Sequence, residues 1–151
     1  MLENMNYIKM IVMTIIGGIG GWIVEMLGGW TEDLKTLLIF MGVDYLLGLM
    51  IAGFWKKSNK SKTGALSSWS AWEGLCRKGA SLFVVLIAYR LDLTLGLTYI
   101  RTAVVIAFIA NEGLSIMENL GIMGVPFPQV VKNAIEILIK KSEEPAESED
   151  V

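Results

Sequence analysis

The sequence predicts an all-α, polytopic integral membrane protein with three to four transmembrane helices and a C-terminal amphipathic helix. Of its 151 residues, 54% are hydrophobic and only 19% are charged, and the mean hydropathy is +0.56. Soluble domains rarely reach such a value. Apolar runs of about 20 residues recur along the chain, which is the length that an α-helix needs to cross a bilayer. We therefore expect a transmembrane helical domain over residues 1–128.

The first candidate span covers residues 8–24. It carries Gly17 and Gly21, a GxxxG pair whose spacing lets two helices approach closely in lipid. Ordinary glycine enrichment in membrane helices explains the pair equally well. No basic region precedes this segment and no small-x-small cleavage site follows it closely, so we expect an uncleaved anchor and not a signal peptide.

The second candidate span covers residues 36–55 and contains an acidic residue, Asp44. About a dozen large apolar residues at roughly −0.5 kcal/mol each outweigh one aspartate at roughly +3 kcal/mol, so the segment still inserts. Gly48 follows Asp44 by one helical turn and lies on the same stripe. A polar group beside a smooth surface predicts a place where another helix packs.

The hydrophilic segment 56–78 is strongly basic and sets the predicted topology. A short loop of this kind stays on the cytoplasmic side, and the acidic 25–35 connection is then expected outside. With four spans, both termini are cytoplasmic. Nucleic acid is not an expected partner, because the loop is tethered between two spans. The topology-determining residues are Lys56, Lys57, Lys60, Lys62, Arg77 and Lys78.

The third candidate span, residues 79–97, is interrupted by Arg90 and Asp92. Two residues apart on a helix, these side chains point about 200° away from each other. They are therefore better partners for other helices or for water than for one another. Alternatively, both lie at the outer membrane interface, with the arginine extending along the apolar surface to reach the headgroups.

The fourth candidate span, residues 100–119, carries a polar stripe along its second half. At about 100° per residue its polar side chains fall within an arc of roughly 120°. Such groups are costly in hydrocarbon, so they face a bundle interior, a partner helix or water. Alternatively, the helix simply leaves the membrane near Glu112. The stripe consists of Asn111, Glu112, Ser115, Glu118 and Asn119.

The C-terminal part is predicted to hold one more helix and a tail. Prolines in the segment 121–128 end the fourth span. Residues 129–141 are amphipathic, which suits an interfacial helix or a helix that packs on another one. Residues 142–151 hold five acids and no base, and they are expected to be a disordered acidic tail.

The sequence contains none of the familiar arrangements of catalytic residues. It has no histidine and a single cysteine, and it lacks zinc-protease, nucleophile-elbow and phosphate-loop motifs. We therefore expect no enzyme, no catalytic residue, no metal site and no cofactor. Polar residues inside a membrane then serve helix association or conduction. The candidates for helix packing or pore lining are Asp44, Gly48, Asp92, Glu112, Ser115, Glu118 and Asn119.

Five short motifs, in order along residues 40–140, resemble those of the phage-lysis and clostridial toxin-secretion holins. They are Asp44-x-x-x-Gly48, Gly74-x-x-Arg77-Lys78, Asp92, Glu112-x-x-Ser115-Ile116-x-Glu118-Asn119 and Gly124-x-Pro126-x-Pro128.

The resemblance implies a homo-oligomer in the lipid bilayer of the bacterial host, a multi-pass protein of the cytoplasmic membrane. Its lesions would release an endolysin or a large toxin and would cause or time lysis. The protein would not need to contact the endolysin or toxin directly. A related regulator, an antiholin, would share the sequence. A membrane scaffold that binds a partner through its C-terminal helix is a further alternative. A selective small-ion channel would need a filter, and none is recognisable.

Overall fold

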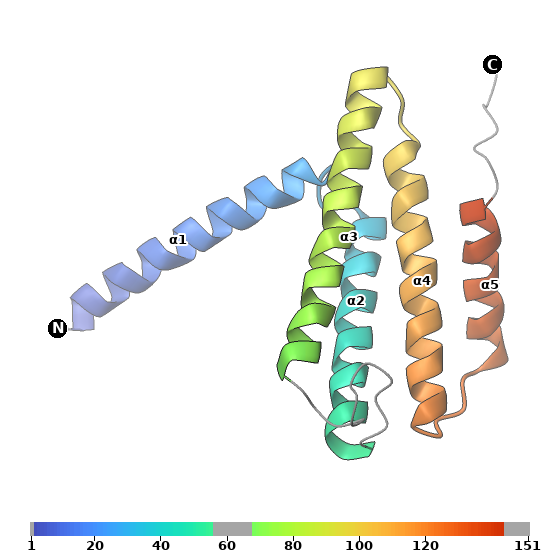
Figure 1. The fold of residues 1–151 in the computed structure, drawn as a ribbon. Helices are drawn as coiled ribbons and strands as arrows, with labels where there is room; N and C mark the ends of the chain where they lie inside the picture. The colour runs from blue at the N-terminus through green and yellow to red at the C-terminus, as the bar shows by residue number, and fades with distance from the viewer. Residues whose placement is uncertain (1, 56–67, 144–151) are drawn as a thin grey trace.

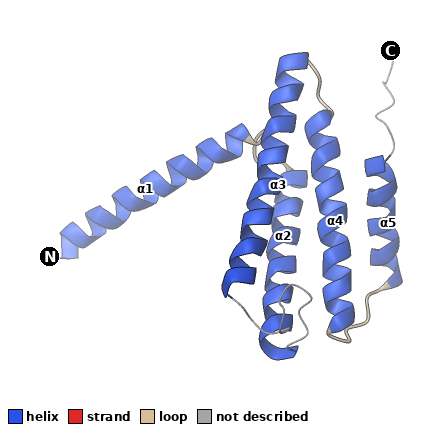
Figure 2. Ribbon diagram, in the orientation of Figure 1, coloured by secondary structure: helices blue, strands red, loops and turns tan. Residues whose placement is uncertain are grey.

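The computed structural model describes residues 2–55 and 68–143, and every element in these ranges is a helix (Figure 2). This confirms the predicted all-α fold class. The helices are α1 (Leu2–Met26), α2 (Glu32–Met50), a short π-helix η1 (Ile51–Trp55) that continues α2, α3 (Ser68–Leu95), α4 (Ile100–Ile122) and α5 (Gln129–Glu143). Residues 56–67 and 144–151 lie outside the described ranges, and so do Lys56, Lys57, Lys60, Lys62 and most of the predicted acidic tail.

Helices α2, α3 and α4 lie side by side as a bundle, α5 runs along α4, and α1 projects away from the bundle (Figure 1). The bundle core is apolar. The side chains that are fully buried in it come from all three helices: Leu34, Leu37, Val85 and Val105. Each of them lies on the inward stripe that an amphipathic helix presents to its neighbours.

Helix α5 packs directly against α4, antiparallel to it (Figure 1). The contact centres on Ile135, which is buried and sits over Gly113. A Cβ atom added at Gly113 would lie only 3.1 Å from Cδ1 of Ile135, so this glycine makes room for the isoleucine. Of the two expected uses of segment 129–141, packing on another helix is the one seen within the chain. Its placement at a membrane interface stays a prediction.

Three of the described helical segments are long and apolar enough to cross a membrane. They are Asn6–Met26, Glu32–Phe54 and Ile100–Ile122. Helix α3, which contains residues 79–95 of the predicted 79–97 span, is not among them. Its apolar part carries Arg90 and Asp92 and is preceded by Lys78. Whether the chain has three or four spans therefore depends on whether α3 crosses the membrane.

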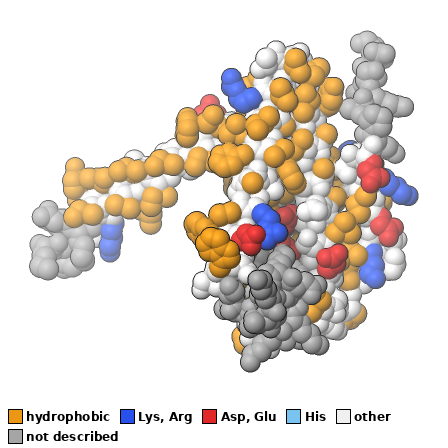
Figure 3. All heavy atoms as spheres, in the orientation of Figure 1, with side chains coloured by type: hydrophobic (Ala, Val, Ile, Leu, Met, Phe, Trp, Pro, Cys, Tyr) orange, Lys and Arg blue, Asp and Glu red, His pale blue; other side chains and the backbone are white. Residues whose placement is uncertain are grey.

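Helix α1 makes little contact with the other described helices. None of its most apolar 18-residue window is buried, and large side chains such as Met13 and Trp22 are more than half exposed. Figure 3 shows hydrophobic side chains along α1 and over the upper part of the bundle, and charged ones near the junction of α1 with the bundle, lower down, and over α5. Lipid is the solvent that suits such an apolar helix.

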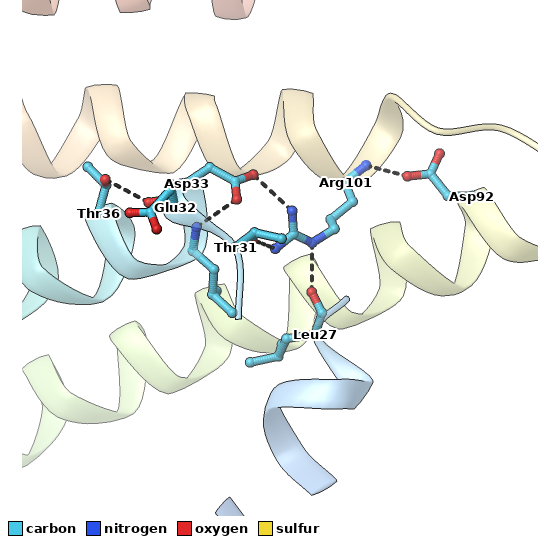
Figure 4. A network of polar contacts seen from close by, with 8 residues as sticks. Leu27, Thr31, Glu32, Asp33, Thr36, Asp92 and Arg101 are labelled. Carbon is cyan, nitrogen blue, oxygen red and sulfur yellow. Dashed lines mark hydrogen bonds and ion pairs between the residues drawn. The ribbon is translucent and has the colours of Figure 1, made fainter. Parts of the chain in front are cut away.

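A buried arginine joins the α1–α2 turn to the start of α4 (Figure 4). The Arg101 guanidinium donates from Nε to the carbonyl of Leu27 at 2.7 Å, from Nη1 to Asp33 Oδ2 at 2.8 Å and from Nη2 to Thr31 Oγ1 at 2.7 Å. Only 7% of Arg101 is exposed. These bonds use three sides of one planar group, and they hold the turn to the bundle.

Asp92, at the end of α3, caps the start of α4 (Figure 4). Its Oδ1 accepts a hydrogen bond from the backbone N–H of Ile100 at 3.0 Å, and its Oδ2 accepts one from that of Arg101 at 2.9 Å. The first N–H groups of a helix have no partner within it, and a carboxylate there is also stabilised by the helix dipole. The use of Asp92 in helix packing between copies or in pore lining stays a prediction.

We predict that Gly28→Ala destabilises the fold more than Gly29→Ala. Both glycines have a positive φ, of 92° and 90°, which costs an alanine roughly 1–2 kcal/mol. Only at Gly28 would the new Cβ also clash, at 2.6 Å from Arg101 Nε, whereas nothing lies within 4 Å at Gly29. Overpacking of this kind adds about 1–3 kcal/mol. Denaturant unfolding in detergent micelles measures both, and equal losses would contradict the clash.

Candidate functional site

Four polar residues from three helices meet inside the bundle, at the level of the middle of α4. Asp44 comes from α2, Lys78 from α3, and Glu112 and Asn119 from α4. We call these four residues the Lys78 cluster. The side chains of Asp44, Lys78 and Glu112 are only 4%, 15% and 9% exposed.

The ammonium group of Lys78 lies between the two carboxylates. It donates to Oδ2 of Asp44 at 2.8 Å and also to Oε2 of Glu112. The second carboxylate oxygen of Asp44, Oδ1, accepts a hydrogen bond from Nδ2 of Asn119 at 2.8 Å. In the described part of the chain, no buried side-chain nitrogen or oxygen atom lacks a hydrogen-bond partner. The cluster is therefore internally satisfied, as buried polar networks must be.

The cluster contains more acid than base. With all three groups ionised, one ammonium faces two carboxylates, so the formal charge is −1. Removing a charge from water costs several kcal/mol, which the partners regain only while they stay together. The Lys78 cluster therefore ties α2, α3 and α4 to one arrangement, and separating these helices requires water or new partners for the charges.

A pocket of about 370 Å³ opens beside the cluster, and its wall is mostly polar. Arg77 lies on this wall, with its side chain 63% exposed and 3.7 Å from Glu73. The pocket gives water a route to the buried charges from the side of the bundle. Its lining consists of Asp44, Gly74, Arg77, Lys78, Ser81, Asn111, Glu112 and Ser115.

The structure brings together part of the predicted set. Asp44, Glu112 and Asn119 meet in the cluster, and Ser115 lines the pocket. Glu118 points outward and is exposed.

The two remaining members of the set lie elsewhere. Among the described residues, nothing lies within 4 Å of a Cβ added at Gly48, which leaves space there for a partner helix. Asp92 lies at the other end of the bundle, at the start of α4.

Two charged residues that bind buried partners, Lys78 and Arg101, are not among the helix-packing candidates that the sequence predicts. Lys78 was assigned to topology alone, yet it shares the inward stripe of α3 with Leu82 and Val85, four and seven residues later. Arg101 lies at the start of the predicted 100–119 span, where it precedes the buried Val105 by one helical turn. A charged residue in phase with core positions is the signal that could have found both.

Comparison with known proteins gives a match to a family model described as the bacteriophage holin family, over residues 21–140. A protein from Clostridium perfringens, described as an uncharacterized 14.9 kDa protein in the nagH 3' region, is 38% identical over 143 residues, 93% of this chain and 99% of that protein. A Listeria monocytogenes protein is 39% identical over 117 residues, 77% of this chain and 78% of its own. One from Bacillus phage phi105, described as a probable holin, is 34% identical over 123 residues, 81% and 85% of the two chains. No solved structure matches.

We predict that Lys78→Met destabilises the bundle by about 3–5 kcal/mol, because it leaves two buried carboxylates without their cation. The neighbouring Arg77→Met is the matched control and should change stability by about 0.5 kcal/mol or less, since that side chain is exposed. The free energy of unfolding in detergent micelles measures both.

A triple variant tests the cause of the loss. Adding Asp44→Asn and Glu112→Gln to Lys78→Met removes the unpaired charges and should recover most of the stability. Equal losses for Lys78→Met and Arg77→Met would contradict a central role for the cluster.

Proposed function

This chain belongs to the bacteriophage holin family, and we propose that it oligomerises in the bacterial cytoplasmic membrane and forms lesions there. Through these lesions an endolysin or a large protein toxin would leave the cell, which causes or times lysis. The holin resemblance predicted from the sequence is confirmed by the family match. The chain is a membrane protein with helices able to span the bilayer.

The Lys78 cluster is the observation that carries this proposal. Its charges are paired within one chain, so a single copy can lie in lipid without exposing them. If α2, α3 and α4 separate, the same side chains need water, and they become suitable lining for an aqueous lesion. A switch of this kind requires two arrangements of similar free energy, and a cluster that is satisfied either internally or by water supplies them.

Two surfaces support self-association. Helix α1 is unburied and carries the Gly17–Gly21 pair. Helix α2 presents Gly48, on the Asp44 stripe, with free space above it. Small residues allow close approach of helices in lipid. We propose a multi-pass topology with the basic segment 56–78, whose last eleven residues form the start of α3, on the cytoplasmic side. We assign the chain no catalytic step, so the wall must be cut by a separate enzyme.

Induced expression in a bacterium tests the proposal. A holin should collapse the membrane potential abruptly and release a cytoplasmic reporter protein. An antiholin would leave the potential intact and delay lysis by a co-expressed holin, and a scaffold subunit would do neither. An intact potential at high membrane levels of the protein would contradict lesion formation.

In the same assay we predict that Glu112→Leu delays the collapse. The variant leaves Lys78 with one carboxylate, Asp44, so the cluster becomes neutral and no longer favours hydration. Insertion of α4 also becomes easier by roughly 2–3 kcal/mol. Glu118→Gln is the control, because Glu118 is exposed on the same helix. The measurement is the time of collapse at matched membrane levels. A wild-type time of collapse for Glu112→Leu would contradict a role for the charge of the cluster in lesion formation.

We also predict that Gly48→Leu weakens oligomers without unfolding the bundle, because no atom of the described residues lies within 4 Å of a Cβ at this glycine. Gly42→Leu is the matched control, since Gly42 is also free of contacts but lies on another face of α2. Chemical crosslinking in membranes should give shorter ladders for Gly48→Leu alone. Unchanged ladders for both variants would remove this face from the interface.

A further inference from the structure

A second pocket lies where α1 leaves the bundle. It has a volume of about 320 Å³ and is formed by the last turns of α1 and the facing part of α3. It is separate from the Lys78 cluster and shares no lining residue with it. Its lining consists of Trp22, Glu25, Met26, Tyr89, Arg90 and Leu93.

Two opposite charges face this pocket without pairing. Glu25 from α1 and Arg90 from α3 are both exposed. Within the described residues, neither side chain makes an ion pair or a hydrogen bond, with the other or with any third group. The two side chains line the same pocket and carry opposite charges, so they are open to a ligand that carries both charges.

The pocket lies at the level where membrane spans end. The apolar segment of α1 ends at Met26, and the next one begins at Glu32. Trp22 and Tyr89 contribute two aromatic rings, which are enriched at the headgroup level of bilayers. Trp22, three residues before Glu25, and Leu93, three residues after Arg90, expose apolar surface beside the charges, at 62% and 54%. Two opposite charges beside aromatic and apolar side chains match the chemistry of a phospholipid.

We propose that this pocket binds phosphatidylethanolamine, with its phosphate on Arg90 and its primary ammonium on Glu25. Guanidinium groups bind phosphate through paired, charge-assisted hydrogen bonds. A primary ammonium has three donors for the carboxylate, whereas the headgroup of phosphatidylglycerol has no cation and leaves Glu25 beside an anion. The glycerol and the upper acyl chains lie along Trp22 and Leu93. This site requires only that the protein lies in a membrane, and it is independent of lesion formation.

Native mass spectrometry of the full-length protein in detergent, titrated with lipid, tests the site. Wild type should retain one phosphatidylethanolamine in preference to phosphatidylglycerol. Arg90→Gln should weaken retention of both lipids by about tenfold, the worth of one charge-assisted hydrogen bond. Glu25→Gln should weaken phosphatidylethanolamine alone and so abolish the preference. Arg77→Gln, an exposed arginine of α3 outside this pocket, should change nothing.

Soluble glycerophosphoethanolamine separates a lipid site from a small-molecule site. It is a phosphodiester that carries the same two charges as the lipid but no acyl chains, and it should compete only at far higher concentration than the lipid. Competition at equal concentration would overturn a lipid ligand. Equal retention of the two lipids by wild type, or an unchanged preference in Glu25→Gln, would overturn the assignment of the two charges.

Discussion

One ammonium group shared by two carboxylates governs the arrangement of this bundle. Lys78 of α3 reaches Asp44 on α2 and Glu112 on α4, so a single side chain connects three helices. Buried ion pairs add little net stability relative to apolar packing, but an unpaired buried charge is very costly. The cluster therefore mainly specifies one arrangement of the three helices, since other registers would leave at least one of its charges unpaired.

Two polar layers enclose the apolar core. In one layer Arg101 binds the α1–α2 turn, and in the other Glu112 binds Lys78. The two residues are eleven positions apart on α4, which corresponds to roughly 17 Å at 1.5 Å per residue. Between them the core is formed by side chains such as Leu37, Val85 and Val105. The apolar layer supplies the burial energy, and the charged layers fix which helix faces meet.

The helical fold and the acidic residues of the cluster could be predicted from the sequence, because an acidic residue in an apolar helix is recognisable by its free-energy cost in lipid alone. It was not sufficient for the partners. Lys78 flanks a basic loop, so a count of positive charges explained it without a contact. The position of α5 could not be predicted either, since an apolar face such as that of Ile135 fits a lipid interface and another helix equally well.

The separation of α1 from the core bears on the order of events during synthesis. Its apolar window has no buried residue, so insertion of α1 does not depend on contacts with the helices that follow it. It can enter the bilayer as soon as it emerges, while the Lys78 cluster requires residues from 44 to 119 to be present. The chain therefore divides biosynthetically into a helix that partitions on its own and a bundle that assembles only when α4 is complete.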